Sequence, residues 1–282
     1  MALTRARLAF IGGGTMAEAM IRGLLERRLV TSSRITASGP RRERRSELVQ
    51  RFGIKASASN VEAAKGAQVV VLSVKPQVLP SVMRELRGTL APDQLVLSIV
   101  AGATSAALRA GLDHAQVVRA MPNTPAQVAM GITVWWAAPS VTAAQRGQAR
   151  AILGALGEEL AVEDEDDVDR ATALSGTGPS YVFLLMEALV DAGVHLGFSR
   201  RVAEELVLRT VEGSALFARR SGRHLAELRN MVTSPGGTSA AALYQLEKGA
   251  LRTVLSRAVY AAYVRTRELG AASEKEPGGR AR

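Results

Sequence analysis

A glycine turn near the N-terminus constrains the fold of this chain more than any other feature. The apolar run Leu8–Ile11 ends in Gly12, Gly13 and Gly14, and a stretch with helical spacing follows at once. With Ala17 in the third place, this is the Gly-x-Gly-x-x-Ala pattern of dinucleotide-binding folds. The first glycine permits a tight turn, the second lets the backbone approach a pyrophosphate, and the alanine lets the helix pack on its strand. The order of strand, turn and helix predicts a dinucleotide site, with the pyrophosphate on the helix N-terminus.

Composition excludes several classes of protein. The 282 residues include no cysteine, which excludes disulfides and thiolate chemistry and is typical of a cytoplasmic protein. The three histidines, His114, His195 and His224, are too far apart in sequence to predict a metal site. The formal net charge is +10, but the basic residues are scattered and no motif interleaves them with stacking aromatic residues. We therefore expect an arginine-rich surface with no nucleic-acid partner. We also expect no membrane partner, because no apolar run reads as long enough to span a bilayer.

The end of the second predicted strand, residues 34–38, is where such folds distinguish NAD from NADP. An acidic residue there would accept a hydrogen bond from the ribose 2′-hydroxyl of NAD, and none is present. Ser38 offers a hydroxyl, and Arg41 and Arg42, just after Pro40, offer guanidinium groups suited to a 2′-phosphate. A solvated helix face is the alternative interpretation of these arginines. Their position relative to the glycine turn favours NADPH, with NADH as the other cofactor.

Other predicted strands end in residues that would meet at the carboxyl edge of the sheet, where ligands bind in such folds. Lys75 and Pro76 follow one buried apolar run, and Gly102 follows the next. Asn123 lies in a stiff turn between two prolines, for which a structural role and a role beside the nicotinamide are equally open.

The periodicity of the sequence changes after an acidic segment at residues 158–169. Before it, short apolar runs alternate with helical stretches, which predicts an α/β fold with a Rossmann-type doubly wound sheet. After it, five helices are expected, at residues 181–196, 200–219, 225–232, 239–248 and 253–269. The predicted domains are an NADP-binding Rossmann domain at 1–165, an all-α substrate-binding and dimerisation domain at 166–270, and a disordered basic tail at 271–282.

Two glycine-rich stretches in the helical half are candidate ligand sites. Residues 175–180 open the first helix and are interpreted as a hinge, a site or both. Further on, Gly236, Gly237, Thr238 and Ser239 stand at the start of a predicted helix and offer backbone N–H groups and hydroxyls to an anion. Alone, this stretch is equally compatible with an ordinary turn and cap. Beside a dinucleotide half, it suggests a substrate that carries a carboxylate.

From Leu8 to Leu269 the sequence resembles the pyrroline-5-carboxylate reductases, which catalyse the last step of proline biosynthesis. The resemblance rests on motifs at residues 10–17, 73–76, 100–102, 121–126, 173–181, 232–239 and 265–269. The glycine turn is shared by many proteins, whereas the stretch 232–239, and its order after 173–181, is specific to the family.

The resemblance implies contacts position by position. The family's NADP contacts match Gly13, Thr15, Met16, Ser38, Asn60, Val74, Lys75 and Ala101, and its substrate or product contacts match Glu165, Thr238 and Ser239. The resemblance also implies a homodimer with interlocked helical domains, in which each active site uses both chains; many members go on to form decamers. Ser239 stands where threonine is usual, which keeps the hydroxyl. Met231 stands where an amide side chain near the cofactor is common, so the resemblance does not extend to that contact.

The predicted reaction is hydride transfer from NADPH to the C=N carbon of 1-pyrroline-5-carboxylate, which gives L-proline. The chain has no obvious acid–base pair, which suits a cyclic imine that enters already protonated and mainly needs alignment. The catalytic residues would be Thr238, holding the carboxylate, and Ser239, near the ring nitrogen.

Three alternatives remain at the level of sequence. A β-hydroxyacid dehydrogenase-like oxidoreductase would need a catalytic lysine from the helical half, and no lysine occurs between Lys75 and Lys248. A non-catalytic NADP-binding regulator, or a basic nucleic-acid-binding protein, would show no turnover, and the latter would be retained on DNA in a salt-dependent way.

Overall fold

The computed structural model describes Leu3 and residues 5–275, which form two units. The first, the sheet unit, runs to Thr177 and takes up the chain again from Ala262; the second, the helical unit, is Gly178–Ala261. The boundary predicted between the NADP-binding domain and the helical domain, at residues 165 and 166, stays a prediction, because compact units need not coincide with functional domains.

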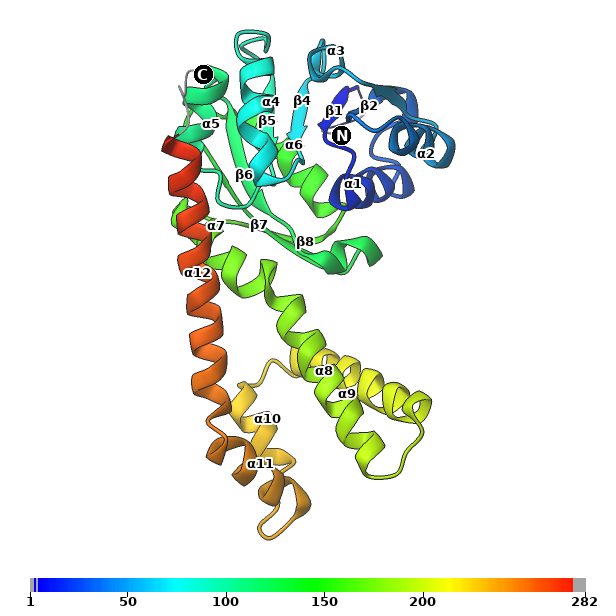
Figure 1. Ribbon diagram of the computed structural model, residues 1–282, viewed down its shortest axis with the longest axis vertical. Coiled ribbons are helices and arrows are strands. Elements are labelled where there is room, and N and C mark those ends of the chain that lie inside the picture. Colours follow the sequence, from blue (N-terminus) through cyan, green and yellow to red (C-terminus); the bar gives the residue numbers. More distant parts are fainter. Residues whose placement is uncertain (1–2, 4, 276–282) are drawn as a thin grey trace. The chain divides into compact units, whose positions relative to one another are not determined.

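A single sheet dominates the sheet unit. In the described part of the chain it has eight strands, in the order β3-β2-β1-β4-β5-β6-β7-β8 (Figure 1). All neighbours are parallel except β6 and β7, which are antiparallel. The strands are β1 (Leu8–Ile11), β2 (Ile35–Ser38), β3 (Lys55–Ser57), β4 (Val69–Leu72), β5 (Leu95–Ser98), β6 (Val117–Met121), β7 (Gly131–Ala137) and β8 (Gly157–Ala161).

Helices cover both faces of this sheet, as the doubly wound prediction requires. Apolar residues of α1 (Thr15–Glu26), α2 (Arg42–Phe52) and α6 (Ala143–Gly154) belong to one core. Those of α3 (Asn60–Ala64), α4 (Leu79–Leu86) and α5 (Ser105–Leu112) belong to the other. In β1, Leu8 and Phe10 face the first core while Ala9 and Ile11 face the second. A strand buried on both faces reads as a continuous apolar run, which is why the central strands were predictable.

The acidic segment that separates the halves in sequence is more ordered than predicted. It contains strand β8, which pairs with β7, and helix α7 (Asp166–Ala171), which leads into the π-helix η4 (Thr172–Gly176). Strand β8 is partly exposed and carries two glutamates, so it lacks the apolar run that marks the central strands. The short strand β3 was missed for the same reason. Three short 3-10 helices complete the unit: η1 (Ser32–Arg34), η2 (Pro76–Val78) and η3 (Thr124–Val128).

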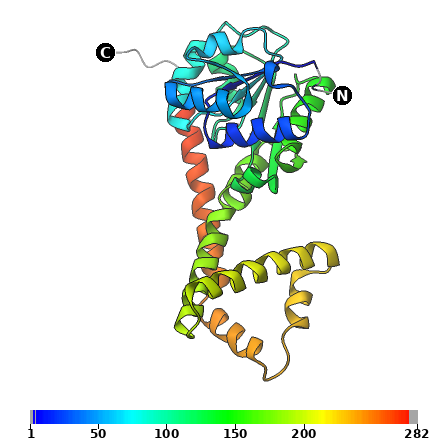
Figure 2. The ribbon, with the colours of Figure 1, turned by 90° about the vertical axis from the view of Figure 1, so that its right-hand side faces the viewer.

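The helical unit contains the five helices predicted from periodicity (Figure 2). They are α8 (Gly178–His195), α9 (Arg200–Ser221), α10 (Leu225–Met231), α11 (Thr238–Lys248) and the first part of α12 (Leu251–Lys275). Gly193 lets α8 and α9 approach closely, since an added Cβ there would lie 3.0 Å from the Ala203 Cβ. Helix α12 continues to Lys275, so residues 271–275 of the predicted tail are helical; the remainder lies outside the described residues.

Many large apolar side chains of the helical unit are exposed. On α8 they include Phe183 and Leu184, at 59% and 66% exposure, and on α9 Leu216 and Phe217. The helical stretch Asp166–His195 is also long and apolar enough to cross a membrane by length and composition, so the expectation of no such run was wrong. Exposed apolar surface on this scale marks a face that another molecule covers.

Candidate functional site

The glycine turn has the geometry that its sequence predicts. Gly12 has a φ of +101°, and its N–H donates to the Ser38 carbonyl across 3.1 Å. A Cβ at Gly12 would lie 2.8 Å from the Ser73 carbonyl oxygen and from Val74 Cγ1, so only glycine fits. A Cβ at Gly14, by contrast, would meet no atom within 4 Å, so this side of the turn is open. The turn is therefore built tightly on its inner side and left accessible where a pyrophosphate would approach.

Helix α1 begins without a capping side chain. Its N-cap is Gly14, and its first backbone hydrogen bond runs from Glu18 N–H to the Gly14 carbonyl (3.0 Å). Helices α3, α5 and α6, by comparison, are capped by Ser59, Thr104 and Thr142. An uncapped N-terminus leaves the N–H groups of its first turn available to an anion.

A pocket next to this turn gathers several predicted cofactor residues. It is lined by Gly12, Gly13, Gly14, Ala37, Ser38, Gly39, Pro40, Arg41, Arg44, Arg45 and Leu48. The Ser38 hydroxyl donates to Asn60 Oδ1 across 2.7 Å, which brings Asn60 to the end of β2. Arg44 and Arg45, rather than Arg42, accompany Arg41 in the lining. The sequence predicted Arg41 and Arg42 from their position, but which arginines line the pocket depends on how α2 turns.

The predicted cofactor residues that follow strands β4 and β6 differ in their contacts. Val74 lies beside Gly12, and Lys75 is the exposed N-cap of η2, with Pro76 as the next residue. The Asn123 side-chain oxygen accepts from Ile132 N–H (3.0 Å), so this amide holds the start of β7.

Gly102, which follows Ala101 after β5, packs against α12. Its φ is +74°, and an added Cβ would lie 2.9 Å from the Leu269 Cβ and 3.0 Å from the Gly270 nitrogen. This close approach of α12 explains the glycine without any ligand.

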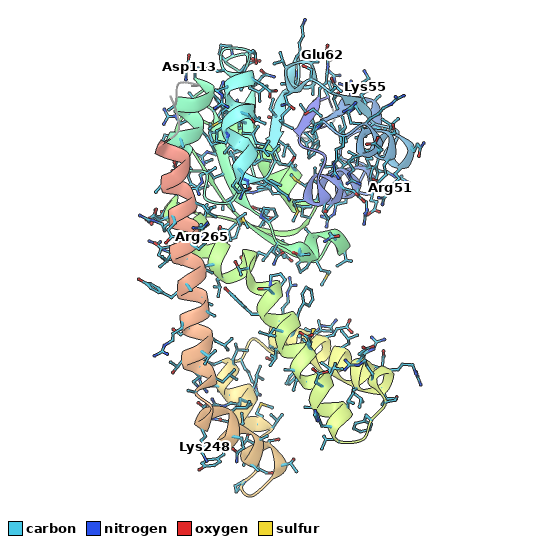
Figure 3. The ribbon with its side chains drawn as sticks, viewed as in Figure 1. Arg51, Lys55, Glu62, Asp113, Lys248 and Arg265 are labelled. Carbon is cyan, nitrogen blue, oxygen red and sulfur yellow. The ribbon has the colours of Figure 1, made fainter. Side chains whose placement is uncertain are left out.

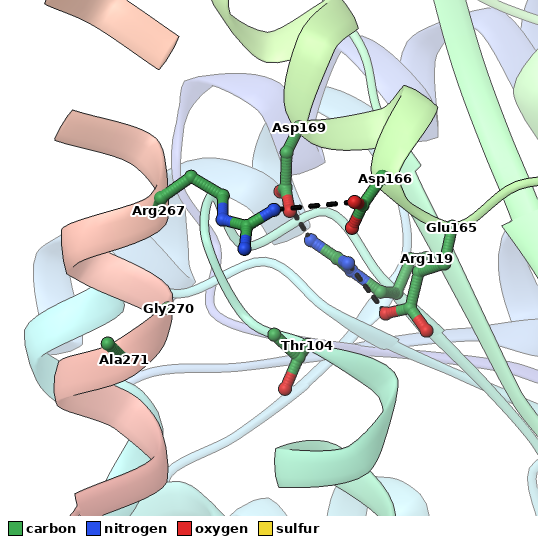
Figure 4. Close-up of a pocket in the computed structure, with 8 residues that line it drawn as sticks. All are labelled: Thr104, Arg119, Glu165, Asp166, Asp169, Arg267, Gly270 and Ala271. Atoms are coloured by element: carbon green, nitrogen blue, oxygen red, sulfur yellow. Dashed lines mark hydrogen bonds and ion pairs between the residues drawn. The ribbon is translucent and has the colours of Figure 1, made fainter. Parts of the chain in front are cut away.

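Glu165, predicted to hold substrate, belongs to a network of ion pairs within the sheet unit (Figure 4). Its carboxylate accepts from the backbone N–H and hydroxyl of Ser105 and from Arg119, with the Arg119 Nη1 at 2.6 Å. Arg119 is almost fully buried and donates its other terminal nitrogen to Asp169 (2.7 Å). Beside them, Arg267 of α12 pairs with Asp166 (3.3 Å). Glu165 is thus held rigidly by its protein partners, a constraint that sequence spacing did not show.

A second network, around Glu18 on α1, was also missed. The Glu18 carboxylate pairs with Arg44, Arg22 and Arg51. Burial works against its ionisation, but the hydrogen bonds and charges of these arginines outweigh burial and hold the pKa of Glu18 below its ordinary value. The network ties the first turns of α1 to helix α2, directly behind the glycine turn.

The glycine-hydroxyl stretch of the helical unit also leads into an uncapped helix. The N-cap of α11 is Gly237, which has no side chain to occupy the first-turn N–H groups. The first helical bond runs from Ala241 N–H to the Gly237 carbonyl (3.2 Å), so the N–H groups of Thr238, Ser239 and Ala240 precede it. Gly236 has a φ of +71°, a conformation that favours glycine. Helix α1 of the sheet unit and helix α11 of the helical unit therefore both begin at a glycine N-cap, where no side chain occupies the first-turn N–H groups.

Comparisons with known proteins match two parts of the chain. Residues 165–269 match the family described as "Pyrroline-5-carboxylate reductase dimerisation", and residues 7–102 match "NADP oxidoreductase coenzyme F420-dependent". A pyrroline-5-carboxylate reductase of Pseudomonas aeruginosa is 44% identical over 264 residues, which is 93% of this chain and 96% of that protein. One of Arabidopsis thaliana is 36% identical and covers 93% and 95%.

A solved structure gives the same answer for the fold. The crystal structure of Plasmodium falciparum pyrroline carboxylate reductase with NADP bound has a TM-score of 0.87 and 30% identity, over 95% of this chain and 99% of that one. Relatives at this identity, matched over nearly their full length, establish the family. The chain belongs to the pyrroline-5-carboxylate reductases.

Proposed function

We propose that this protein reduces 1-pyrroline-5-carboxylate to L-proline with NADPH as the hydride donor, and NADH as a second donor. The observation that carries the proposal is the pair of glycine-capped helix N-termini, on α1 and α11. Each suits one anion: the pyrophosphate of a dinucleotide and the carboxylate of a small substrate.

The sheet unit supplies the residues for the dinucleotide. Gly12, Gly13 and Gly14, with Thr15 and Met16 in the first turn of α1, face the pyrophosphate. The pocket beyond β2 suits the ribose 2′-phosphate, because Ser38 offers a hydroxyl and Arg41 a guanidinium, with Pro40 and Asn60 beside them. The positions after the next strands, which are Val74, Lys75, Pro76, Ala101, Gly102 and Asn123, complete the set on the nicotinamide side. The tight inner side and open outer side of the glycine turn fit such a ligand.

The helical unit supplies residues for the carboxylate. Gly236 and Gly237 shape the turn, and Thr238 and Ser239 add hydroxyls to the first-turn N–H groups of α11. The sheet unit supplies one further residue that we propose for the substrate: Glu165, whose carboxylate is fixed by Arg119 and Ser105 and suits a protonated ring nitrogen.

The reaction requires the side chains mainly to align the substrate with the dinucleotide. The bound dinucleotide supplies the hydride that reduces the C=N bond. Because the imine nitrogen arrives protonated, reduction at carbon gives the secondary amine of proline without a proton donor from the chain. The Thr238 hydroxyl holds the substrate carboxylate, and the Ser239 hydroxyl lies near the ring nitrogen. Together they restrict the substrate ring to one orientation.

The active protein is a homodimer with interlocked helical domains, and a decamer is the larger assembly that we propose. The family match at residues 165–269 and the exposed apolar side chains of α8 and α9 support this. The cytoplasmic location and the absence of nucleic-acid and membrane partners stay predictions from sequence.

Substitution in the first turn of α11 tests the proposal. Replacing Thr238 and Ser239 together by alanine removes both hydroxyls, so the KM for pyrroline-5-carboxylate should rise at least about tenfold while NADP+ binding is unchanged. Thr233→Ala is the matched control, since its hydroxyl donates to the Arg229 carbonyl (2.7 Å) within the chain. Unchanged kinetics in the double variant would remove the proposed substrate site.

A further inference from the structure

Arg44 joins the glycine turn to helix α2 through a contact of its own. Its Nε donates to the Gly13 carbonyl across 2.7 Å, from a side chain that is only 19% exposed. The peptide between Gly13 and Gly14 is planar and trans, so fixing this carbonyl also fixes the Gly14 N–H on the opposite side. Leu48 of the same helix abuts the turn, since a Cβ at Gly13 would lie 2.8 Å from Leu48 Cδ1. Helix α2 therefore contacts the glycine turn through both Arg44 and Leu48.

Glu18 holds the Arg44 guanidinium in place. Its Oε2 accepts from Arg44 Nη2, while its Oε1 pairs with Arg22 at 2.9 Å and with Arg51 at 2.7 Å. The Glu18 side chain is 11% exposed, so these pairs are more strongly coupled than pairs on the open surface. Arg51, which Figure 3 labels, comes from the last turn of α2, so the carboxylate binds both ends of that helix.

The sign of the Glu18 charge argues for a geometric role. A carboxylate close to a predicted phosphate site repels the ligand, so charge alone would favour a neutral residue at position 18. A carboxylate at position 18 is explained if it orients a hydrogen-bond donor, the Arg44 guanidinium. Arg45 shows the same use of a guanidinium, since its Nη1 donates to the carbonyls of Gly39 (2.6 Å) and Pro40 (2.8 Å) on the other wall of the pocket.

We infer that Glu18 and Arg44 are positioning residues for dinucleotide binding: Glu18 orients Arg44, and Arg44 fixes the Gly13–Gly14 peptide toward the pyrophosphate. The inference rests on the proposed function only for the identity of the ligand as a pyridine dinucleotide. Because the pyrophosphate is common to NADP+ and NAD+, the two positioning residues support the binding of both.

Calorimetric binding of NADP+ and of NAD+ to the purified protein tests this without any turnover. Glu18→Ala and Arg44→Lys should each weaken the binding of both dinucleotides by about tenfold, the loss expected for one hydrogen bond to a charged group. Arg44→Lys keeps the charge but loses the planar fork that reaches Gly13 and Glu18 together. Glu18→Gln, which retains an acceptor oxygen, should restore part of the loss seen in Glu18→Ala.

Glu43→Gln is the control, because it removes one negative charge from an exposed position on the first turn of α2 and should change binding by less than about twofold. Tighter binding in Glu18→Ala would mean that only its charge matters, and a loss confined to NADP+ would make Arg44 a direct phosphate ligand; either result overturns the inference. Melting curves check the fold, and if Glu18→Ala is unfolded, the charge-conserving Arg44→Lys decides. A protein that binds NADP+ but fails to reduce the imine refutes the proposed function and leaves this inference standing.

Discussion

At the scale of single residues, Glu18 makes the stability of the sheet unit depend on pH. The neighbouring arginines hold the pKa of Glu18 below its ordinary value in the folded chain, so the unfolded chain takes up the proton first as the pH falls. The stabilisation is therefore complete above about pH 4.5 and is lost as the pH drops through the folded pKa. Glu18→Gln should lower the melting temperature at pH 7, and the difference from the natural protein should shrink below pH 4. Thermal melts followed by circular dichroism at both pH values measure this, and a difference that grows in acid would contradict the assignment.

The sequence predicted the glycine turn, but not the two side chains, Glu18 and Arg44, that hold it in place. Gly12 and Ala17 were predictable because their roles follow from local geometry, and both occupy the expected positions. Arg44 and Glu18 are 26 residues apart in sequence and meet only because α1 and α2 pack on the same face of the sheet. No local pattern encodes that contact. The sequence therefore offered Arg41 and Arg42 by position, and the direction of α2 brought in Arg44 and Arg45.

At the scale of elements, the last turns of α12 depend on glycine where they meet the loop after β5. An added Cβ at Gly270 would lie 2.8 Å from the Gly102 carbonyl oxygen, whereas one at Gly147 of α6 would meet nothing within 4 Å. Gly270→Ala should destabilise the protein by about 1–3 kcal/mol through overpacking. Gly147→Ala should stabilise it by about 0.5–1 kcal/mol, because alanine is the better helix former. Urea denaturation of the two variants compares them directly, and equal shifts of the same sign would refute the close approach.

Elements were predictable from sequence in proportion to their burial. Strands β1, β4 and β5 are buried along their length and read as apolar runs. Strand β8 exists because it pairs with β7, not because its own residues favour a strand, and the acidic residues around it masked α7 as well. Tertiary pairing overrides local propensity at such edges.

At the scale of the whole molecule, the exposed apolar face of α8 predicts assembly. Phe183→Asp places a charge on this face and should convert the oligomer into smaller species, because a charge is costly to bury at a subunit interface. Leu160→Asp, at a similarly exposed apolar position on β8, should leave the oligomer intact. Sedimentation velocity distinguishes the two, and a natural protein that sediments as a monomer would contradict the prediction. The resemblance of the sequence to its family implied an oligomer, but assembly size is not encoded in one chain's periodicity.

The most direct measurement of the central claim is a stoichiometric assay with the purified protein, NADPH and pyrroline-5-carboxylate. Absorbance at the NADPH band follows cofactor oxidation, and chromatography of the product quantifies proline. The account predicts one proline formed for each NADPH consumed, with slower turnover when NADH replaces NADPH. NADPH that binds but is not oxidised in the presence of the imine would contradict it.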